Sequence, residues 1–183
     1  MKLIEVTDDY VNYMKQFFKS TMLDSKEGIR THNRKYLGII ISINGNNYFA
    51  PLSSPKKSDF SKDGKIKKST SIVLRMIKKT KTKESLLGTI KLNNMMPVPN
   101  SEILPYDLSK EEDIKYKNLV IEELEWIQHN TRKIVRTATT LYYLKINENK
   151  NKNNKNEKYF NSIMPFIVAE EKCREYIILK NKW

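Results

Sequence analysis

Alternating apolar and polar positions predict short β-strands in the first half of the chain. The stretches YLGIIISI (36–43) and YFAPL (48–52) flank NGNN, and Asn-Gly is the residue pair typical of a tight hairpin turn. They are expected to pair as a hairpin whose second strand ends between Pro51 and Pro55, because proline donates no ladder hydrogen bond. The other expected strands are KLIEVT (2–7), SIVLRMI (71–77), LLGTIKL (86–92) and the short EIL (102–104).

Helical spacing of apolar residues dominates the second half of the chain. A capping box, Ser109-x-x-Glu112, predicts a helix that ends near residue 130, and a second helix is expected at 131–146. A last helix is expected at about 165–181, and DDYVNYMKQFF (8–18) predicts an early one. Strands first and helices later favour an α+β fold with an antiparallel sheet.

Three stretches lack a hydrophobic period and are expected to be loops. The stretch 20–34 carries Arg30, His32 and Arg34, and the stretch 56–70 is rich in lysine and serine. The Asn/Lys-rich stretch at about 147–158 has nothing with which to build a core, so it is expected to be a flexible surface loop. A length of 183 residues suits one domain, spanning 1–183.

The composition is that of a soluble protein, with 39% hydrophobic and 30% charged residues. No apolar run approaches the roughly 18 residues of a membrane span, and Asp8 and Asp9 interrupt the start where a signal peptide stays apolar. A cytoplasmic protein with no membrane partner is expected. Cys173 is the single cysteine, which excludes an intrachain disulfide and favours a buried, inert thiol.

The positive charge is concentrated in one segment. Of a net charge of +13, residues 56–91 contribute +9, from twelve Lys or Arg and three Asp or Glu. Such a field attracts polyanions, and the segment lacks the apolar helix face that a membrane surface would require. The alternative is that the charge serves only solubility.

Several catalytic chemistries find no support in the residue pattern. Ser53-x-x-Lys56 matches a penicillin-recognising motif, but Pro55 follows a strand there and the partner motifs are missing. His32 and His129 are far apart and form no metal-ligand motif, so no metal or cofactor is expected. His129 falls at the end of a helix, where a histidine complements the dipole, and the role of His32 stays open.

The remaining candidate is a cationic site at the end of a strand. It comprises Ser53, Ser54, Lys56 and Lys57, with the Arg30–Arg34 loop entering the same hairpin from its other side. Cleavage of RNA by its own 2′-hydroxyl needs groups that orient the ribose, move protons and stabilise a pentavalent phosphate, and these residue types suit that task. A Ser/Pro/Lys turn that merely ends the hairpin explains the same residues equally well.

A family resemblance favours the first interpretation. The motif YFAPLSSPKK (48–57), together with YLGIIISING before it, resembles the ToxN/AbiQ family of type III toxin-antitoxin endoribonucleases. The resemblance extends to DDYVNYMKQF, to LLGTIKLNNMMPVP and to the helix that contains Tyr116 and Lys117. It implies the fold of MazF- and Kid-like toxins, a strongly bent antiparallel β-sheet surrounded by helices.

The resemblance also implies an activity and its residues. Family members cleave RNA without metal, leave 2′,3′-cyclic phosphate ends and act in phage defence by abortive infection. They are restrained by a small repeated pseudoknot RNA that they process from a precursor. By position, Ser53 and Ser54 match the family's hydroxyl pair and Lys56 matches its lysine. Arg34 would assist by clamping phosphate, because arginine keeps its charge.

The sequence therefore predicts a metal-independent endoribonuclease toxin whose partners are messenger RNA and the antitoxin RNA, with no DNA partner. The catalytic residues are expected to be Ser53, Ser54, Lys56 and Arg34. The residues expected to bind RNA are Arg30, Lys57, Arg75, Lys78, Lys79, Lys81, Lys83 and Tyr116. A non-catalytic RNA-binding protein and a structural partner of an acidic protein are the alternatives.

Overall fold

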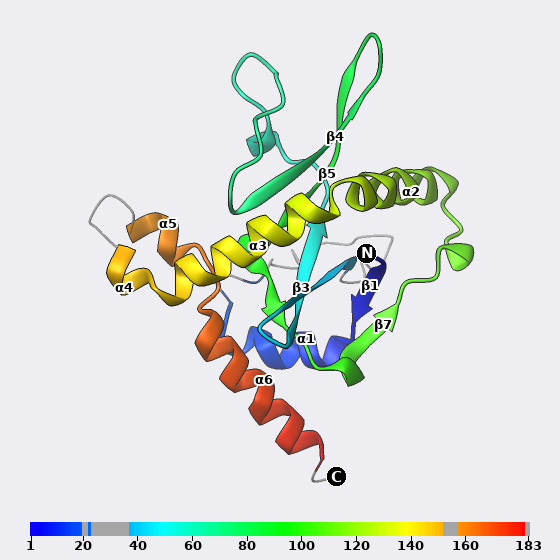
Figure 1. Ribbon diagram of the computed structural model, residues 1–183. Helices are drawn as coiled ribbons and strands as arrows, with labels where there is room; N and C mark the ends of the chain where they lie inside the picture. Colours follow the sequence, from blue (N-terminus) through cyan, green and yellow to red (C-terminus); the bar gives the residue numbers. More distant parts are fainter. Residues whose placement is uncertain (20–21, 23–36, 152–156, 182–183) are drawn as a thin grey trace.

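The computed structural model describes residues 1–19, 22, 37–151 and 157–181 (Figure 1). The fold is α+β and is built on an antiparallel sheet, as the sequence predicts. The strand order is β4-β5-β3-β2-β1-β7, and β6 pairs with β3 outside this path. The strands are β1 Leu3–Val6, β2 Leu37–Ile43, β3 Asn46–Ser53, β4 Val73–Lys79, β5 Glu84–Lys91, β6 Met96–Pro97 and β7 Ile103–Pro105.

The hairpin β2–β3 forms where the Asn-Gly pair predicts it. Asn44 and Gly45 have positive φ angles of 50° and 76°, as a two-residue hairpin turn of type I′ requires. Beyond Pro51 the strand β3 changes neighbours: it pairs with β2 up to Gly38↔Pro51 and with β5 at Ser53↔Thr89. Strand pairing ends at Ser53, so the first of the two serines lies at a strand end, as expected.

The helices confirm most of the predicted boundaries. They are α1 Asp8–Lys15, α2 Ile114–His129, α3 Thr131–Ile146, α4 Glu148–Asn151, α5 Glu157–Asn161 and α6 Phe166–Lys180. The Ser109–Glu112 capping box is wrong, because Ser109 lies in a separate turn, Leu108–Lys110. Helix α2 starts after Asp113 instead, whose carboxylate accepts the backbone N–H groups of Lys115 and Tyr116.

The stretch at 147–158 is not wholly loop, because α4 and the start of α5 occupy its two ends. Two contacts explain this local order. The Nζ atom of Lys145 lies 2.6 Å from Glu148 Oε2 and 3.1 Å from the carbonyl oxygen of Phe160. Phe160, which lies two residues after this stretch, is itself buried, so its apolar side chain holds α5 against the rest of the protein.

The core lies between the sheet and the helices α1, α3 and α6 (Figure 1). Tyr48 of β3 packs edge-on against Tyr142 of α3 and Phe166 of α6, and its hydroxyl donates to Glu170. The thiol of Cys173 is buried in the same region, and this burial raises its pKa, in agreement with the expected inert cysteine.

None of the helices described is long and apolar enough to cross a membrane.

Replacing Gly38 by alanine is expected to destabilise the fold by about 2–3 kcal/mol, measured by urea denaturation. A Cβ there would lie 2.4 Å from both Ala50 O and Phe49 Cε2 in the neighbouring strand. The control is Gly45→Ala, where a Cβ meets nothing within 4 Å and only the left-handed backbone is strained, at a cost of about 1 kcal/mol. Equal losses for the two variants would contradict the close packing of β2 on β3.

Candidate active site

Ser53, at the end of β3, lies in a row of three polar side chains on neighbouring strands, Ser53, Thr89 and Arg75, which we call the Ser53 row. Ser53 of β3 pairs with Thr89 of β5, and Thr89 pairs with Arg75 of β4. Residues opposite one another in a sheet direct their side chains to the same face. The Ser53 hydroxyl makes a contact of 3.4 Å with Ser54 O, which is too long for a strong hydrogen bond. This hydroxyl is therefore suited to binding a ligand.

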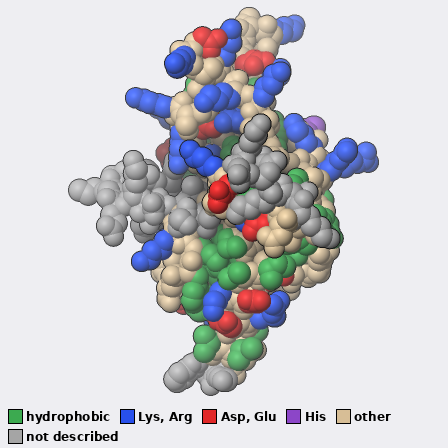
Figure 2. Space-filling model, turned by 90° about the vertical axis from the view of Figure 1, so that its left-hand side faces the viewer, with side chains coloured by type: hydrophobic (Ala, Val, Ile, Leu, Met, Phe, Trp, Pro, Cys, Tyr) green, Lys and Arg blue, Asp and Glu red, His purple; other side chains and the backbone are tan. Residues whose placement is uncertain are grey.

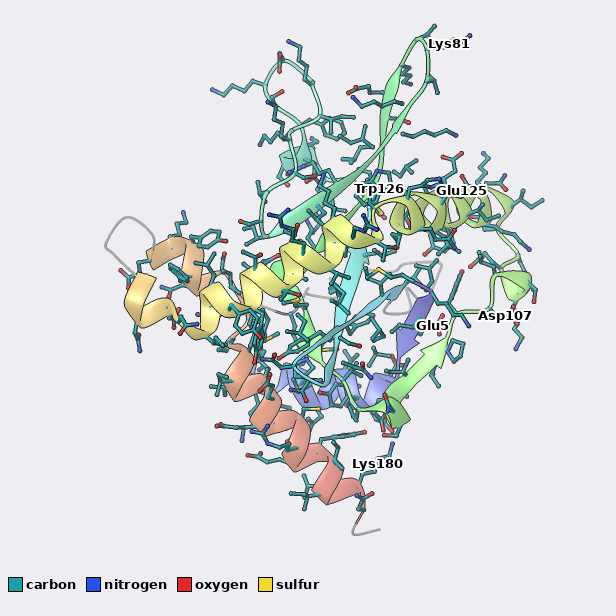
Figure 3. The ribbon with its side chains drawn as sticks, in the orientation of Figure 1. Glu5, Lys81, Asp107, Glu125, Trp126 and Lys180 are labelled. Carbon is teal, nitrogen blue, oxygen red and sulfur yellow. The ribbon has the colours of Figure 1, made fainter. Side chains whose placement is uncertain are left out.

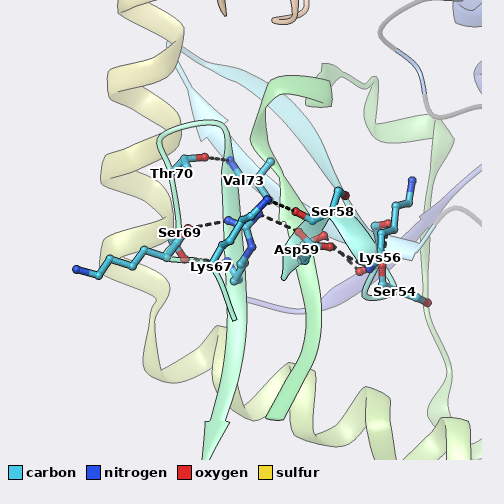
Figure 4. A network of polar contacts seen from close by, with 12 residues as sticks. Ser54, Lys56, Ser58, Asp59, Lys67, Ser69, Thr70 and Val73 are labelled. Carbon is cyan, nitrogen blue, oxygen red and sulfur yellow. Dashed lines mark hydrogen bonds and ion pairs between the residues drawn. The ribbon is translucent and has the colours of Figure 1, made fainter. Parts of the chain in front are cut away.

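The turn after the serines is held by a buried carboxylate (Figure 4). Asp59 Oδ2 accepts the backbone N–H of Lys56 at 3.0 Å, and the N–H of Asp59 donates to Lys56 O at 2.9 Å. The other oxygen of Asp59 lies 2.9 Å from Arg75 Nη2. The two side chains are only 2% and 9% exposed, so the pair ties the Lys56 backbone to the sheet from within the protein.

The sequence predicts that Arg75 binds RNA. In the structure, however, its side chain is bonded to Asp59 and to a backbone carbonyl. Besides the ion pair, its Nη1 donates to Lys68 O at 2.7 Å and its backbone N–H donates to Ser69 Oγ at 2.8 Å. The alternation of β4 directs this side chain onto the sheet face that residues 56–70 cover. The number of charged residues in a sequence segment does not reveal which arginines are buried and which are exposed.

The other predicted lysines lie on the surface, and two of them have acidic partners among the described residues. Lys78 pairs with Glu122 of α2 at 2.6 Å, and Lys79 pairs with Glu84 across the hairpin at 2.6 Å. Lys81 lies at the tip of the β4–β5 hairpin and points away from the sheet (Figure 3). Lys83 follows in the same exposed turn.

The three acids of the basic segment, residues 56–91, are all paired within the segment: Asp59 with Arg75, Asp63 with Lys65 and Glu84 with Lys79. Eight of its bases make no ion pair with any residue that the structure describes. These are Lys56, Lys57, Lys62, Lys67, Lys68, Lys81, Lys83 and Lys91. Figure 2 shows lysine and arginine side chains gathered over the upper part of the molecule, at the level of the β4–β5 hairpin. The local field is therefore strongly positive around the Ser53 strand end.

Other predicted residues lie away from this row or outside the described part of the chain. Arg30, His32 and Arg34 lie outside it. Tyr116 is in the first turn of α2 and packs partly against the core. His129 ends α2 and its Nδ1 lies 2.7 Å from Glu125 O, in keeping with a structural role. No group of three His, Cys, Asp or Glu suited to a metal occurs in the portion of the chain that is described.

Three residues near the strand end, Thr89, Lys91 and Glu123, were not predicted as site residues from the sequence. Thr89 and Lys91 lie on β5, one position and three positions after Gly88. Glu123 of α2 is 6% exposed, and a Cβ on Gly88 would lie 2.2 Å from its Oε1 and 3.1 Å from Ser53 O. Gly88 thus allows a buried carboxylate to approach the backbone beside Ser53. A glycine inside an apolar strand is the one local signal of such an approach.

Burial lowers the pKa of the Lys91 ammonium. Asp59 opposes this effect, whereas the positive charges of Lys56 and Arg75 add to it. Lys91 is therefore half-buried beside the Lys56–Asp59 turn and on the strand that pairs with Ser53.

Residues 2–172 match the family described as "Toxin ToxN, type III toxin-antitoxin system", and the chain belongs to this family. The relative Endoribonuclease AbiQ of Lactococcus lactis subsp. lactis is 30% identical over 142 residues, which cover 78% of this chain and 74% of AbiQ. Endoribonuclease ToxN of Bacillus thuringiensis subsp. kurstaki is 25% identical over 178 residues, which cover 96% of this chain and 84% of that protein.

A solved structure from a bacterial antiviral system regulated by a processed non-coding RNA has the same fold. Its TM-score is 0.75 at 25% identity, and the match covers 96% of this chain and 98% of that chain. The predicted family is therefore confirmed, as is its enzyme class, the RNA-cleaving enzymes.

Arg75→Met is expected to lower the free energy of unfolding by about 3–5 kcal/mol, because it leaves Asp59 buried without its partner. Urea denaturation measures the loss. Lys79→Met breaks an exposed ion pair, with side chains 72% and 52% exposed, and is expected to cost less than about 1 kcal/mol. A double variant, Asp59→Leu with Arg75→Met, should recover part of the stability. A loss for Arg75→Met no larger than that for Lys79→Met would show that the buried pair does not hold the turn.

Proposed function

We propose that this protein is the toxin of a type III toxin–antitoxin system and cleaves RNA without a metal ion, leaving a 2′,3′-cyclic phosphate. The observation that carries the proposal is the strand end at Ser53, where hydroxyl groups and an exposed lysine follow one another on a turn fixed by Asp59. Membership of the ToxN family and the endoribonuclease relatives support it.

The chemistry follows from the charges that develop during cleavage. The RNA supplies its own nucleophile, the 2′-hydroxyl, which releases its proton to solvent as its oxygen bonds to phosphorus and the bond from phosphorus to the 5′-oxygen breaks. Negative charge grows on the non-bridging oxygens, where Ser53 and Ser54 donate hydrogen bonds and the Lys56 ammonium provides opposite charge. The alternative role of Lys56 is to protonate the leaving 5′-oxygen, and Arg34 assists as a phosphate clamp.

The basic segment guides RNA to this strand end. Lys57, Lys81 and Lys83 are exposed and make no ion pair with another described residue, so they are the residues best suited to contact phosphates. Lys78 and Lys79 exchange their surface acid partners for RNA at little cost, because exposed ion pairs are weak.

The same surface serves messenger RNA and the antitoxin, a small repeated pseudoknot RNA that the toxin processes from its precursor. The similar antiviral system regulated by a processed non-coding RNA supports this assignment. The biological setting is phage defence by abortive infection in the cytoplasm.

The purified protein is expected to cut RNA in the presence of EDTA, with 2′,3′-cyclic phosphate ends identified by mass spectrometry. Lys56→Ala should slow cleavage by about 10²-fold or more, because it removes a charge that stabilises the transition state. Lys2→Ala serves as the control, since Lys2 is an exposed lysine beside β1, three strands from β5 in the sheet. Loss of cutting in EDTA, or a wild-type rate for Lys56→Ala, would sink the mechanism.

Growth separates this function from a non-catalytic RNA-binding protein. A catalytic toxin stops growth when it is expressed alone, and Ser53→Ala or Lys56→Ala restores it. If wild-type and variant proteins are all harmless and still bind RNA, the binding function is the correct one.

Lys81→Ala with Lys83→Ala is expected to reduce the salt dependence of RNA binding. Each phosphate contact that is lost should lower the slope of log K against log salt by about 0.7 for single-stranded RNA. The measurement is fluorescence anisotropy of an RNA oligonucleotide with 2′-methoxy groups, which cannot be cleaved, over a range of salt concentrations. An unchanged slope would show that the tip of the β4–β5 hairpin does not contact RNA.

A further inference from the structure

We propose that Lys91 is a second lysine of the cleavage site, and that its ammonium group contacts the scissile phosphate beside Ser53. This inference rests on the proposed ribonuclease function and adds a residue that binds the reacting group. Three observations support it. The strand register places Lys91 near Ser53, Lys91 makes no hydrogen bond or ion pair with the described residues, and another buried lysine, Lys145, does make such bonds.

The register places Lys91 on the face of the sheet that carries the Ser53 row. Ser53 pairs with Thr89, and Lys91 lies two residues further along β5, so Thr89 and Lys91 share one face. Lys91 is thus the diagonal neighbour of Ser53, with Cα atoms about 7–8 Å apart in a regular sheet. This distance is within reach of a lysine side chain that contacts a phosphate bound to the serine hydroxyl.

The opposite face of β5 holds the nearby buried carboxylate. The missing Cβ of Gly88 points at Glu123 Oε1, and Gly88 alternates with Thr89 along the strand. Glu123 therefore lies on the other side of the sheet from the Lys91 side chain and does not neutralise it.

Among the described residues that act on Lys91, positive charges outnumber negative ones. Asp59 is the acid that acts on Lys91, and its two oxygens are already occupied by Arg75 and by the Lys56 backbone N–H. Lys56 and Arg75 repel the Lys91 ammonium, and burial lowers its pKa. An anion bound between Ser53, Lys56 and Lys91 would relieve this repulsion, and a phosphate group of RNA has the required charge.

A comparison with Lys145 shows what a structural lysine looks like in this fold. Lys145 is 9% exposed, and its Nζ contacts Glu148 Oε2 at 2.6 Å and Phe160 O at 3.1 Å. Lys91 is also withdrawn from solvent, but it makes no hydrogen bond or ion pair with the residues described. A desolvated charge with no partner destabilises the free protein, which is typical of residues kept for a ligand.

The test compares Lys91→Met with Lys145→Met in the full-length protein. Lys91→Met is expected to slow single-turnover RNA cleavage by about 10²-fold while the free energy of unfolding stays the same or increases. Lys145→Met should lose stability but keep its cleavage rate under conditions where it is folded. Lys91→Arg retains the charge and should recover part of the rate.

Affinity provides a readout that does not need catalysis. Lys91→Met should weaken binding of the 2′-methoxy RNA oligonucleotide about tenfold, as expected for the loss of a charged hydrogen bond, whereas Lys145→Met should not. Wild-type cleavage and affinity in Lys91→Met would overturn the inference, and so would a loss of stability as large as that of Lys145→Met.

The outcomes also separate this inference from the proposed function. If Lys56→Ala is inactive but Lys91→Met is fully active, only the role of Lys91 fails. If the wild-type protein binds RNA without cutting it, the ribonuclease function fails. The affinity of Lys91→Met for the oligonucleotide then decides whether Lys91 contacts a phosphate.

Discussion

The buried ion pair between Asp59 and Arg75 is the interaction on which the site depends. It joins the turn after the two serines to β4, two strands away from β3 in the sheet, and so fixes the backbone from which Lys56 projects. A buried pair recovers its desolvation cost only when the remaining polar atoms are also bonded. Arg75 meets this condition only in part: its Nη1 donates to Lys68 O, but its Nε is buried and has no hydrogen-bond partner among the described residues. The pair is thus a constraint on conformation more than a source of stability.

That constraint also shapes the electrostatic field. Asp59 is paired with Arg75, so it holds the turn but only partly offsets the charge of the lysines around it. Asp63 and Glu84 are each paired with a single lysine. The bases that make no ion pair with a described residue include Lys56 and Lys57, just after the strand end, and Lys81 at the tip of the β4–β5 hairpin (Figure 3). A polyanion can follow this surface to Ser53, so the residues proposed to attract RNA would also lead it to the proposed site of cleavage.

The hydrophobic pattern predicts individual helices, strands and turns well, but it predicts poorly how the strands pair and which side chains meet. The Asn-Gly turn and the boundaries of α3 follow from neighbouring residues, and both are confirmed. The capping box at Ser109 fails because Asp113, which is also a good N-cap residue, lies immediately before the first turn of α2 and caps it instead. The burial of Arg75, the position of Glu123 behind Gly88 and the shared face of Ser53 and Lys91 all depend on strand register. Register is set by long-range pairing, which no short stretch of sequence reveals.

Within the described part of the chain, the free protein therefore holds a group of cations that the acids beside them do not balance. Repulsion between Lys56, Arg75 and Lys91 disfavours the fold, and it persists because Asp59 and the sheet hold the three groups together. A phosphate at this point gains the free energy that the repulsion costs, so RNA that binds here also stabilises the folded state. In the mechanism that we propose, the charge that grows on the phosphate during cleavage is greater than that of bound RNA, and fixed cations stabilise it further without reorganising. Under this proposal, destabilisation of the free protein and stabilisation of the transition state have one physical origin, the placement of positive charge before the ligand arrives.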